Sequence, residues 1–140
     1  PTIDEGNDVL IKVLVGKVKN ISSAVQTYSP VSIFDVQFTK PNLIDLDISK
    51  NQTVMVYIID GELKFHDENQ IARKGQMIYF DQSSDMINLA SISPTGSYLV
   101  LAGEPLNEPV VRYGPFVTNT EGDMKKAMLD FQNGKMGTLS

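Results

Sequence analysis

The feature that most constrains the fold is a series of short segments in which apolar and polar residues alternate. The alternation runs through residues 9–15, 34–38 and 44–48. Side chains along a β-strand point to opposite faces in turn, so a period of two predicts a strand with one buried face. These patterns predict a mostly β chain whose strands each give one face to a common core.

The middle of the chain predicts a central strand followed by a tight hairpin. Residues 54–59 are apolar throughout, which suits a strand covered on both faces. Asp60-Gly61 follows, and glycine accepts the positive φ that a short hairpin turn requires. Further strand patterns run over residues 77–80, 87–92 and 98–101. Many short strands at this spacing indicate a β-sandwich or small barrel over residues 9–102.

The segment after these strands is rich in proline. Residues 103–119 contain Pro105, Pro109 and Pro115. Proline lacks a backbone N–H and restricts φ, so a continuous helix or a central strand is excluded there. We expect a proline-rich strap over residues 103–119.

One helix is expected to close the chain. Thr120 is a suitable N-cap residue. The apolar residues that follow at the spacing of one helical face are Met124, Ala127, Met128 and Phe131. Gly134 suits the position after a helix end. We therefore expect an amphipathic helix over residues 120–133 and a tail over 134–140.

Composition removes several classes of chemistry. The chain has 140 residues, one histidine (His66) and no cysteine. A cysteine nucleophile, a zinc ribbon, an iron–sulfur cluster, a disulfide and a multi-histidine metal site are therefore excluded, whereas a metal held by carboxylates and carbonyls stays open. The net charge is −5, so we expect no direct nucleic-acid binding. No apolar run approaches the roughly 20 residues of a membrane span, so we expect no membrane association.

Two segments near the end of the chain are specific enough to indicate a family. They read LAGEPLNEP over residues 101–109 and YGPFVTNT over residues 113–120. Together with the Asn133-Gly134 helix end and the stretches 54–65 and 12–16, they resemble the carboxyl-terminal part of pirin and pirin-like proteins. The resemblance covers essentially the whole chain. It implies a cupin-type β-sandwich, or jelly-roll barrel, with one C-terminal helix.

Pirin-like proteins are bicupins, in which two cupin halves form one protein. The resemblance implies that residues 1–140 are the second half, a single carboxyl-terminal cupin domain. The family's metal, usually iron, lies in the amino-terminal half on three histidines and a glutamate. Family activities include quercetin dioxygenation and, in animals, a nuclear cofactor role in transcription. We expect a cytoplasmic protein, or a nuclear one in a eukaryote, with iron only in the amino-terminal half.

The first cupin ligand motif, G-x5-H-x-H-x3–4-E-x6-G, tests whether this half binds a metal of its own. With its final glycine at Gly61, the glutamate position falls on Val54. The two histidine positions fall on Ile48 and Lys50, or on Asp47 and Ser49 with the longer spacer. Asp47 is the best ligand that these paired positions offer.

The second motif, G-x5-P-x-G-x2-H-x3-N, supplies the remaining histidine. With its second glycine at Gly75, the proline position falls on Arg73 and the histidine position on Ile78. Valine and isoleucine have no lone pair to donate, so Val54 and Ile78 cannot hold iron as the family does. We expect no metal and no cofactor in this chain, and a barrel interior filled by packed side chains.

Other polar residues have a functional and a structural interpretation, and we favour the structural one. His66 could be a pH-sensitive ligand group, but we expect an exposed turn residue. Asp45 and Asp47, with Asp35 nearby, could serve acid–base chemistry or bind a hard cation, but their alternation with apolar residues indicates a solvated sheet face. The acidic residues of the amino end are Asp4, Glu5 and Asp8, and we expect them to lie in an interdomain connection.

We expect the chain to act as a structural and interaction domain that performs no catalysis by itself. Its partner would be the amino-terminal cupin half, through Glu104, Asn107, Glu108, Tyr113, Phe116, Met124, Met128 and Phe131. Further protein partners and self-association of the isolated domain through the helix stripe are also expected. One alternative is that the parent protein is a metal-dependent quercetin 2,3-dioxygenase whose iron lies in the other half. Another is a small-molecule pocket inside the barrel beside Val54 and Ile78.

Overall fold

The chain consists of two compact units, Pro1–Pro105 and Leu106–Ser140. The computed structural model describes residues 1–4, 6, 8–65, 70–80 and 85–137. His66 and Glu5 therefore lie outside the described residues.

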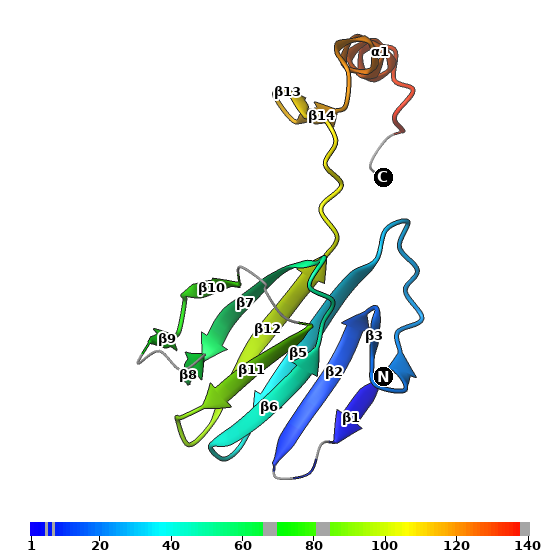
Figure 1. The fold of residues 1–140 in the computed structure, drawn as a ribbon. Helices are drawn as coiled ribbons and strands as arrows, with labels where there is room; N and C mark the ends of the chain where they lie inside the picture. Colours follow the sequence, from blue (N-terminus) through cyan, green and yellow to red (C-terminus); the bar gives the residue numbers. More distant parts are fainter. Residues whose placement is uncertain (5, 7, 66–69, 81–84, 138–140) are drawn as a thin grey trace. The chain divides into compact units, whose positions relative to one another are not determined.

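The first unit is a β-sandwich of two antiparallel sheets (Figure 1). In the described part of the chain, the larger sheet has six strands in the spatial order β1 (Thr2–Asp4), β2 (Val9–Val15), β5 (Val31–Phe38), β12 (Gly96–Gly103), β7 (Thr53–Asp60) and β10 (Met77–Phe80). The smaller sheet has four, in the order β6 (Asn42–Asp47), β11 (Met86–Ser91), β8 (Glu62–Phe65) and β9 (Ile71–Arg73). The two short strands β3 (Lys17–Val18) and β4 (Ile21–Ser22) form a separate pair.

The hydrophobic core lies between the two sheets. The six-stranded sheet contributes alternate residues of its inner strands, among them Val9, Ile11, Val13, Phe34, Val36, Phe38, Val54, Val56, Ile58, Tyr98, Val100 and Ala102. The four-stranded sheet contributes Ile44, Leu46, Leu63, Ala72, Ile87 and Leu89. The alternation seen in the sequence thus becomes the inner faces of the two sheets.

Strand β7 differs from the expectation that it is covered on both faces. Its inner residues are buried, but Tyr57 and Ile59 on the other face are 37% and 40% exposed. The apolar run 54–59 therefore has one face in the core and one face open in the described part of the chain.

The hairpin between β7 and β8 depends on Gly61. Its φ is +85°, and a Cβ atom at this position would lie 2.5 Å from Ser93 Oγ and 2.8 Å from the Thr95 carbonyl oxygen. The Glu62 backbone N–H donates a hydrogen bond to the same Ser93 oxygen at 2.9 Å. The hairpin is therefore packed closely against the turn that precedes β12.

Replacing Gly61 by alanine is expected to destabilise the protein more than the same change at Gly75. Both residues have positive φ, which costs a non-glycine residue about 1–2 kcal/mol. A Cβ atom at Gly75 would meet no other atom within 4 Å, whereas one at Gly61 would displace the neighbouring turn. Urea denaturation of the two variants measures the difference. Equal losses in the free energy of unfolding would contradict the close packing at Gly61.

The second unit contains a hairpin that the sequence analysis missed. In place of an irregular strap, β13 (Val111–Tyr113) pairs with β14 (Phe116–Thr118). Gly114, with φ +54°, and Pro115 form the turn between them. A Gly-Pro pair between apolar and aromatic residues is a turn signal that could have predicted this hairpin.

The C-terminal helix α1 (Glu121–Gln132) lies within the segment expected to be helical. Thr120 is its N-cap, and its hydroxyl oxygen accepts a hydrogen bond from the Asp123 backbone N–H at 3.1 Å. Asn133 is the C-cap and Gly134 follows with φ +68°. The prediction of a mostly β sandwich with one C-terminal helix is confirmed. In the described residues, no helix has the length and apolar character that crossing a bilayer demands.

Candidate functional site

The positions that correspond to the cupin metal ligands include three core residues. Val54 on β7 and Ile78 on β10 lie on neighbouring strands, where Ile78 faces Val56 across the pair. Ile48, at the end of β6, is buried as well. All three side chains are aliphatic, so this part of the interior offers no donor atom to a metal.

The other ligand positions are at the surface. Asp47, Ser49 and Lys50 are exposed. Asp85 holds this loop in place, because its carbonyl oxygen accepts from the Ile48 backbone N–H at 3.1 Å and its Oδ1 from the Lys50 N–H at 2.7 Å. With either spacer of the first motif, the ligand positions that have donor atoms are exposed, and those that are buried have no donor atom.

The residues present therefore do not fit the iron of the family. That iron requires imidazole and carboxylate donors that converge on one point. In the residues that the structure describes, no group of three or more histidine, cysteine, aspartate or glutamate side chains could hold a metal ion.

The structure separates Asp35 from Asp45 and Asp47, which are both exposed on the outer face of β6. Asp45 lies on the four-stranded sheet, where its carboxylate accepts a hydrogen bond from Asn88 on the neighbouring strand. Asp35 lies on the six-stranded sheet opposite Lys12 and accepts from Gln37. Asp35 and Asp45 belong to different sheets, so these two do not form an acid–base pair.

The acidic amino end makes local contacts. Asp4 Oδ1 accepts a hydrogen bond from the Gly6 N–H at 2.9 Å. Asp8 Oδ2 lies 2.6 Å from Lys40 Nζ. This hydrogen-bonded ion pair holds the pKa of Asp8 below its usual value and raises the pKa of Lys40.

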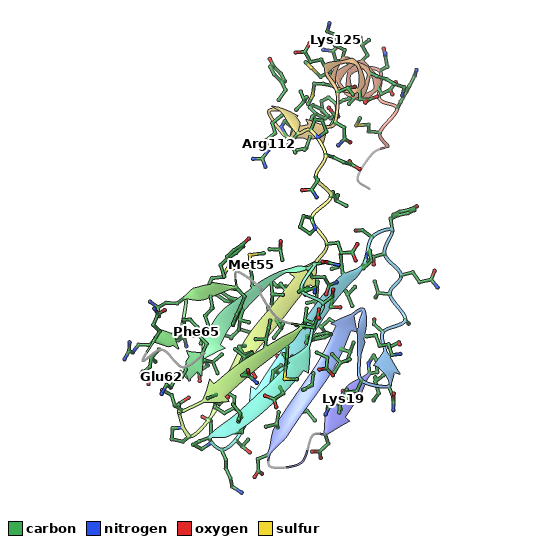
Figure 2. The ribbon with its side chains drawn as sticks, in the orientation of Figure 1. Lys19, Met55, Glu62, Phe65, Arg112 and Lys125 are labelled. Atoms are coloured by element: carbon green, nitrogen blue, oxygen red, sulfur yellow. The ribbon has the colours of Figure 1, made fainter. Side chains whose placement is uncertain are left out.

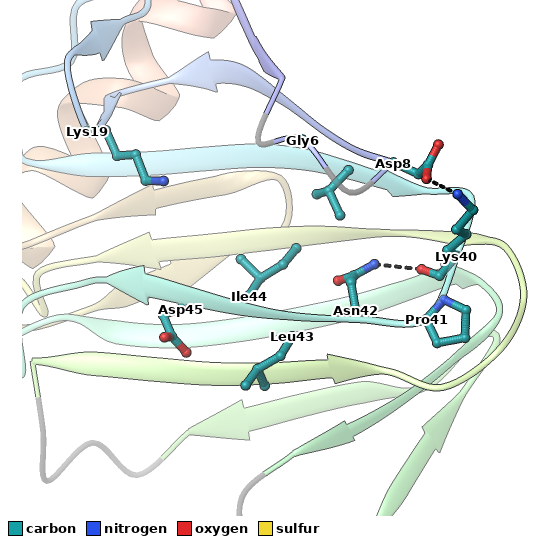
Figure 3. Close-up of a pocket in the computed structure, with 10 residues that line it drawn as sticks. Gly6, Asp8, Lys19, Lys40, Pro41, Asn42, Leu43, Ile44 and Asp45 are labelled. Atoms are coloured by element: carbon teal, nitrogen blue, oxygen red, sulfur yellow. Dashed lines mark hydrogen bonds and ion pairs between the residues drawn. The ribbon is translucent and has the colours of Figure 1, made fainter.

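A hollow of about 640 Å³ lies between this amino end and β6 (Figure 3). Its lining carries charges of both signs, from Asp8 and Lys40 on one side and from Lys19 and Asp45 farther along. Asn42 Nδ2 donates to the Lys40 carbonyl oxygen at 2.8 Å, and this bond ties β6 to the loop before it. The lining does not favour one ligand class, because each cation has an anion in the same hollow.

Three polar side chains lie in or beside the core. Asn42 Oδ1, Ser91 Oγ and Tyr98 Oη are buried and have no hydrogen-bond partner among the described residues. Ser91 faces Asn42 across the β6–β11 pair. Burial raises the pKa of Tyr98 far above its usual value. The phenol is therefore neutral at physiological pH, and an internal water is the usual partner of such groups.

A small cavity also lies at β2, β5 and β6, where Lys19, Asp45 and Asp47 form the polar part of its lining. It has a volume of about 30 Å³, and the apolar part of its lining is Ile11, Val18, Phe34, Ile44 and Leu46. A volume of this size holds a water molecule or two rather than an organic ligand.

The strap residues of the second unit contact one another. Glu108 Oε2 accepts a hydrogen bond from Asn119 Nδ2 at 2.7 Å, and the same amide donates to the Pro109 carbonyl oxygen at 3.0 Å. Asn107 adopts positive φ, at +52°. Glu104 belongs to the first unit, where its backbone N–H donates to the Pro30 carbonyl oxygen.

The helix stripe is divided between the interior and the surface of the second unit. Met124 is buried and Met128 is half-buried. Phe131 is exposed, although its ring meets that of Phe116 edge-on at a centroid distance of 5.6 Å. Tyr113 on β13 is exposed too. The stripe thus packs partly on the hairpin and leaves aromatic surface open.

Known proteins resemble this chain along almost all of its length. Residues 33–137 match the Pirin C-terminal cupin domain family. Pirin of Rattus norvegicus is 34% identical over 131 residues, a match that covers 92% of this chain and 45% of the rat protein. Pirin-1 of Arabidopsis thaliana is 32% identical over 136 residues, covering 95% of this chain and 47% of that protein.

A solved structure agrees with these sequence matches. The crystal structure of quercetin 2,3-dioxygenase from Acinetobacter baumannii superposes with a TM-score of 0.87 at 27% identity, covering 100% of this chain and 48% of that one. The chain spans less than half the length of each of these relatives. The predicted cupin-type fold is confirmed, and the chain belongs to the pirin C-terminal cupin domain family.

Proposed function

We propose that this chain is the non-metal carboxyl-terminal cupin domain of a longer protein with two cupin halves. Residues 1–140 act as one domain that completes the two-domain body and performs no catalysis by itself. The observation that carries this proposal is the aliphatic character of the buried ligand positions Val54 and Ile78. A site without donor atoms cannot position a metal for chemistry.

The second unit supports an interdomain role. Among its described residues, Met124 is the one buried hydrophobic side chain. Units below about 40 residues rarely hold together without a disulfide, a metal or a partner, and this chain has no cysteine. Its exposed apolar residues include Tyr113, Val117, Leu129, Phe131 and Met136. We infer that this surface docks on the preceding cupin half, and that the isolated chain uses it in self-association.

The contacts of that docking surface would come from the strap, the hairpin and the helix. The residues that we assign to it are Glu104, Asn107, Glu108, Tyr113, Phe116, Met128 and Phe131, whereas Met124, which the sequence also suggested, is buried inside the second unit and supports the helix from there. Other protein partners would use the same surface. The cytoplasmic or nuclear location that we propose rests on the family resemblance alone.

Metal analysis tests the proposal. We expect the purified chain to carry no stoichiometric transition metal, because its buried ligand positions donate nothing. The variant His66→Ala is the control, since it removes the one imidazole that could bind metal nonspecifically. One tightly bound transition metal per chain, retained in His66→Ala, would overturn the non-metal assignment.

A second candidate function concerns the longer protein. Because a quercetin 2,3-dioxygenase shares this fold at 27% identity, we propose as an alternative that the parent protein oxidises a flavonol with iron held in its other half. Quercetin consumption is then expected of the longer protein and not of this chain with added ferrous iron. An upstream reading frame without the H-x-H and glutamate pattern would remove this alternative and leave the structural role intact.

A further inference from the structure

The outer face of the six-stranded sheet is apolar across four neighbouring strands. The register places Ile33, Leu101, Met55 and Tyr79 side by side on β5, β12, β7 and β10. The next row along the strands contains Leu99, Tyr57 and Met77, and Asp35 on β5 ends this row. These seven residues define the outer patch, and its member Met55 on β7 is labelled in Figure 2. They contribute no charge, and they alternate with the buried core residues of the same strands.

The four-stranded sheet provides an internal comparison. Its outer face mixes exposed apolar residues, Leu43, Ile71 and Met86, with the Asp45–Asn88 hydrogen bond and the ion pair of Arg73 Nε with Glu62 Oε1 at 2.9 Å. Polar residues of this kind are normal on the solvent face of an antiparallel sheet. The outer patch departs from that pattern, and contiguous apolar surface of this kind marks interaction sites.

The patch also has a hollow that could receive a side chain. A depression of about 310 Å³ lies at the end of β5, β7 and β12, between Ile33, Met55, Leu101 and Pro105. Gly103 is among its lining residues and adds no side chain to it. Apolar anchors that enter such hollows carry much of the binding energy of an interface.

We propose that the portion of the longer protein that precedes this domain packs on the outer patch. This inference rests on the proposed function, because it requires a preceding half. The family match is to a C-terminal domain, and more than half of each relative's length lies outside the match. Strand β1 is the edge of the same sheet, where the Pro1 carbonyl oxygen accepts from the Val13 N–H at 2.9 Å. Polypeptide that precedes Pro1 would therefore emerge beside this sheet.

Hydroxyl-radical footprinting of the longer protein tests the proposal, because methionine and tyrosine side chains oxidise readily when exposed. Met77 in the patch and Met86 on the four-stranded sheet are a matched pair, at 53% and 47% exposure. In the isolated chain we expect the two methionines to oxidise at similar rates. In the longer protein we expect Met77 and Tyr79 to be protected about tenfold while Met86 stays reactive.

Equal oxidation of Met77 and Met86 in the longer protein overturns this inference. If Tyr113 and Met136 are protected in that same sample, the docking role of the second unit survives and only the outer patch is refuted. If no residue of either surface is protected, the proposed function fails too. Protection of Met77 in the isolated chain that increases with concentration would mean that a second copy covers the patch, which also overturns the proposal.

A pair of charge variants supplies an independent readout. In the longer protein with a protease site before Pro1, we expect the cleaved halves to elute together on size exclusion. Met77→Lys with Tyr79→Lys should weaken that association about tenfold or more, whereas Met86→Lys should leave it unchanged. All three substitutions fall on exposed positions of β10 or β11, so we expect each variant to keep the fold. Circular dichroism checks this expectation. Undiminished association of the double variant contradicts the proposal.

Discussion

Replacing Val54 by glutamate is expected to lower the free energy of unfolding by about 4 kcal/mol or more. Val54 is fully buried between the two sheets, and the other buried ligand-equivalent positions, Ile78 and Ile48, are aliphatic. A carboxylate there would lose its hydration without gaining a partner, which is among the costliest single changes to a core. Chemical denaturation at pH 7 measures the loss, with Leu43→Glu on the outer face of the other sheet as the control.

The pH dependence of the Val54→Glu variant identifies the cause of that loss. Burial raises the pKa of a carboxyl group above the value of about 4.3 that it has in the unfolded chain. The neutral acid is tolerated, so the stability of the variant is retained below that pH and is lost as pH rises through the folded-state pKa. We expect the deficit against the unmodified chain to shrink on acidification. A deficit that is independent of pH would point to steric overlap instead.

The same variant tests the metal assignment directly. Glutamate restores the carboxylate of the first cupin motif, but Ile48 and Ile78 still donate nothing. Added ferrous iron is therefore expected to leave the stability of Val54→Glu unchanged. Recovery of stability at one equivalent of iron would show that donors outside the positions assigned above complete a site.

The second large effect is expected for Leu89→Ala. Leu89 on β11 is 0% exposed, and Leu43 on the adjacent strand β6 is 68% exposed on the opposite face of the same sheet. Removing a buried leucine side chain costs about 2–5 kcal/mol through lost transfer energy and the cavity that remains. Leu43→Ala should change stability by less than about 0.5 kcal/mol, as surface substitutions do.

Denaturation of these two variants side by side measures which face of the four-stranded sheet is buried. The comparison is exact in chemistry, since both changes remove the same atoms from neighbouring strands. Similar losses for Leu89→Ala and Leu43→Ala would mean that both faces of this sheet are covered in solution, which contradicts the described sandwich.

Much of the fold was predictable because it depends on neighbours in sequence. The alternation in residues 9–15 and 44–48 is a property of a single strand, and it identified the core residues Ile11 and Leu46 correctly. The helix was predictable for the same reason, since the Thr120 cap and the apolar spacing act within one or two turns. The hairpin of β13 and β14 was missed because the prolines exclude only a continuous helix or a central strand, and a short hairpin that they flank or turn is compatible with them.

The candidate site was predictable in its chemistry but not in its arrangement. That Val54 and Ile78 lack donor atoms follows from residue type alone. The loop of Ser49 and Lys50 is held by Asp85, which lies far along the chain and accepts from two backbone N–H groups through its carbonyl oxygen and its carboxylate. Contacts of this kind leave no periodic signal in a sequence.

The sequence by itself determined that this chain has paired β-strands, one capped helix and no histidine cluster for a metal, because pattern, capping and donor atoms are properties of residues and their near neighbours. Only the tertiary structure decided that Tyr57 and Met77 share an open outer face. The faces of a sheet are set by the pairing of strands that are distant in sequence. An apolar run alone therefore cannot tell a face buried in the core from one left open for a partner.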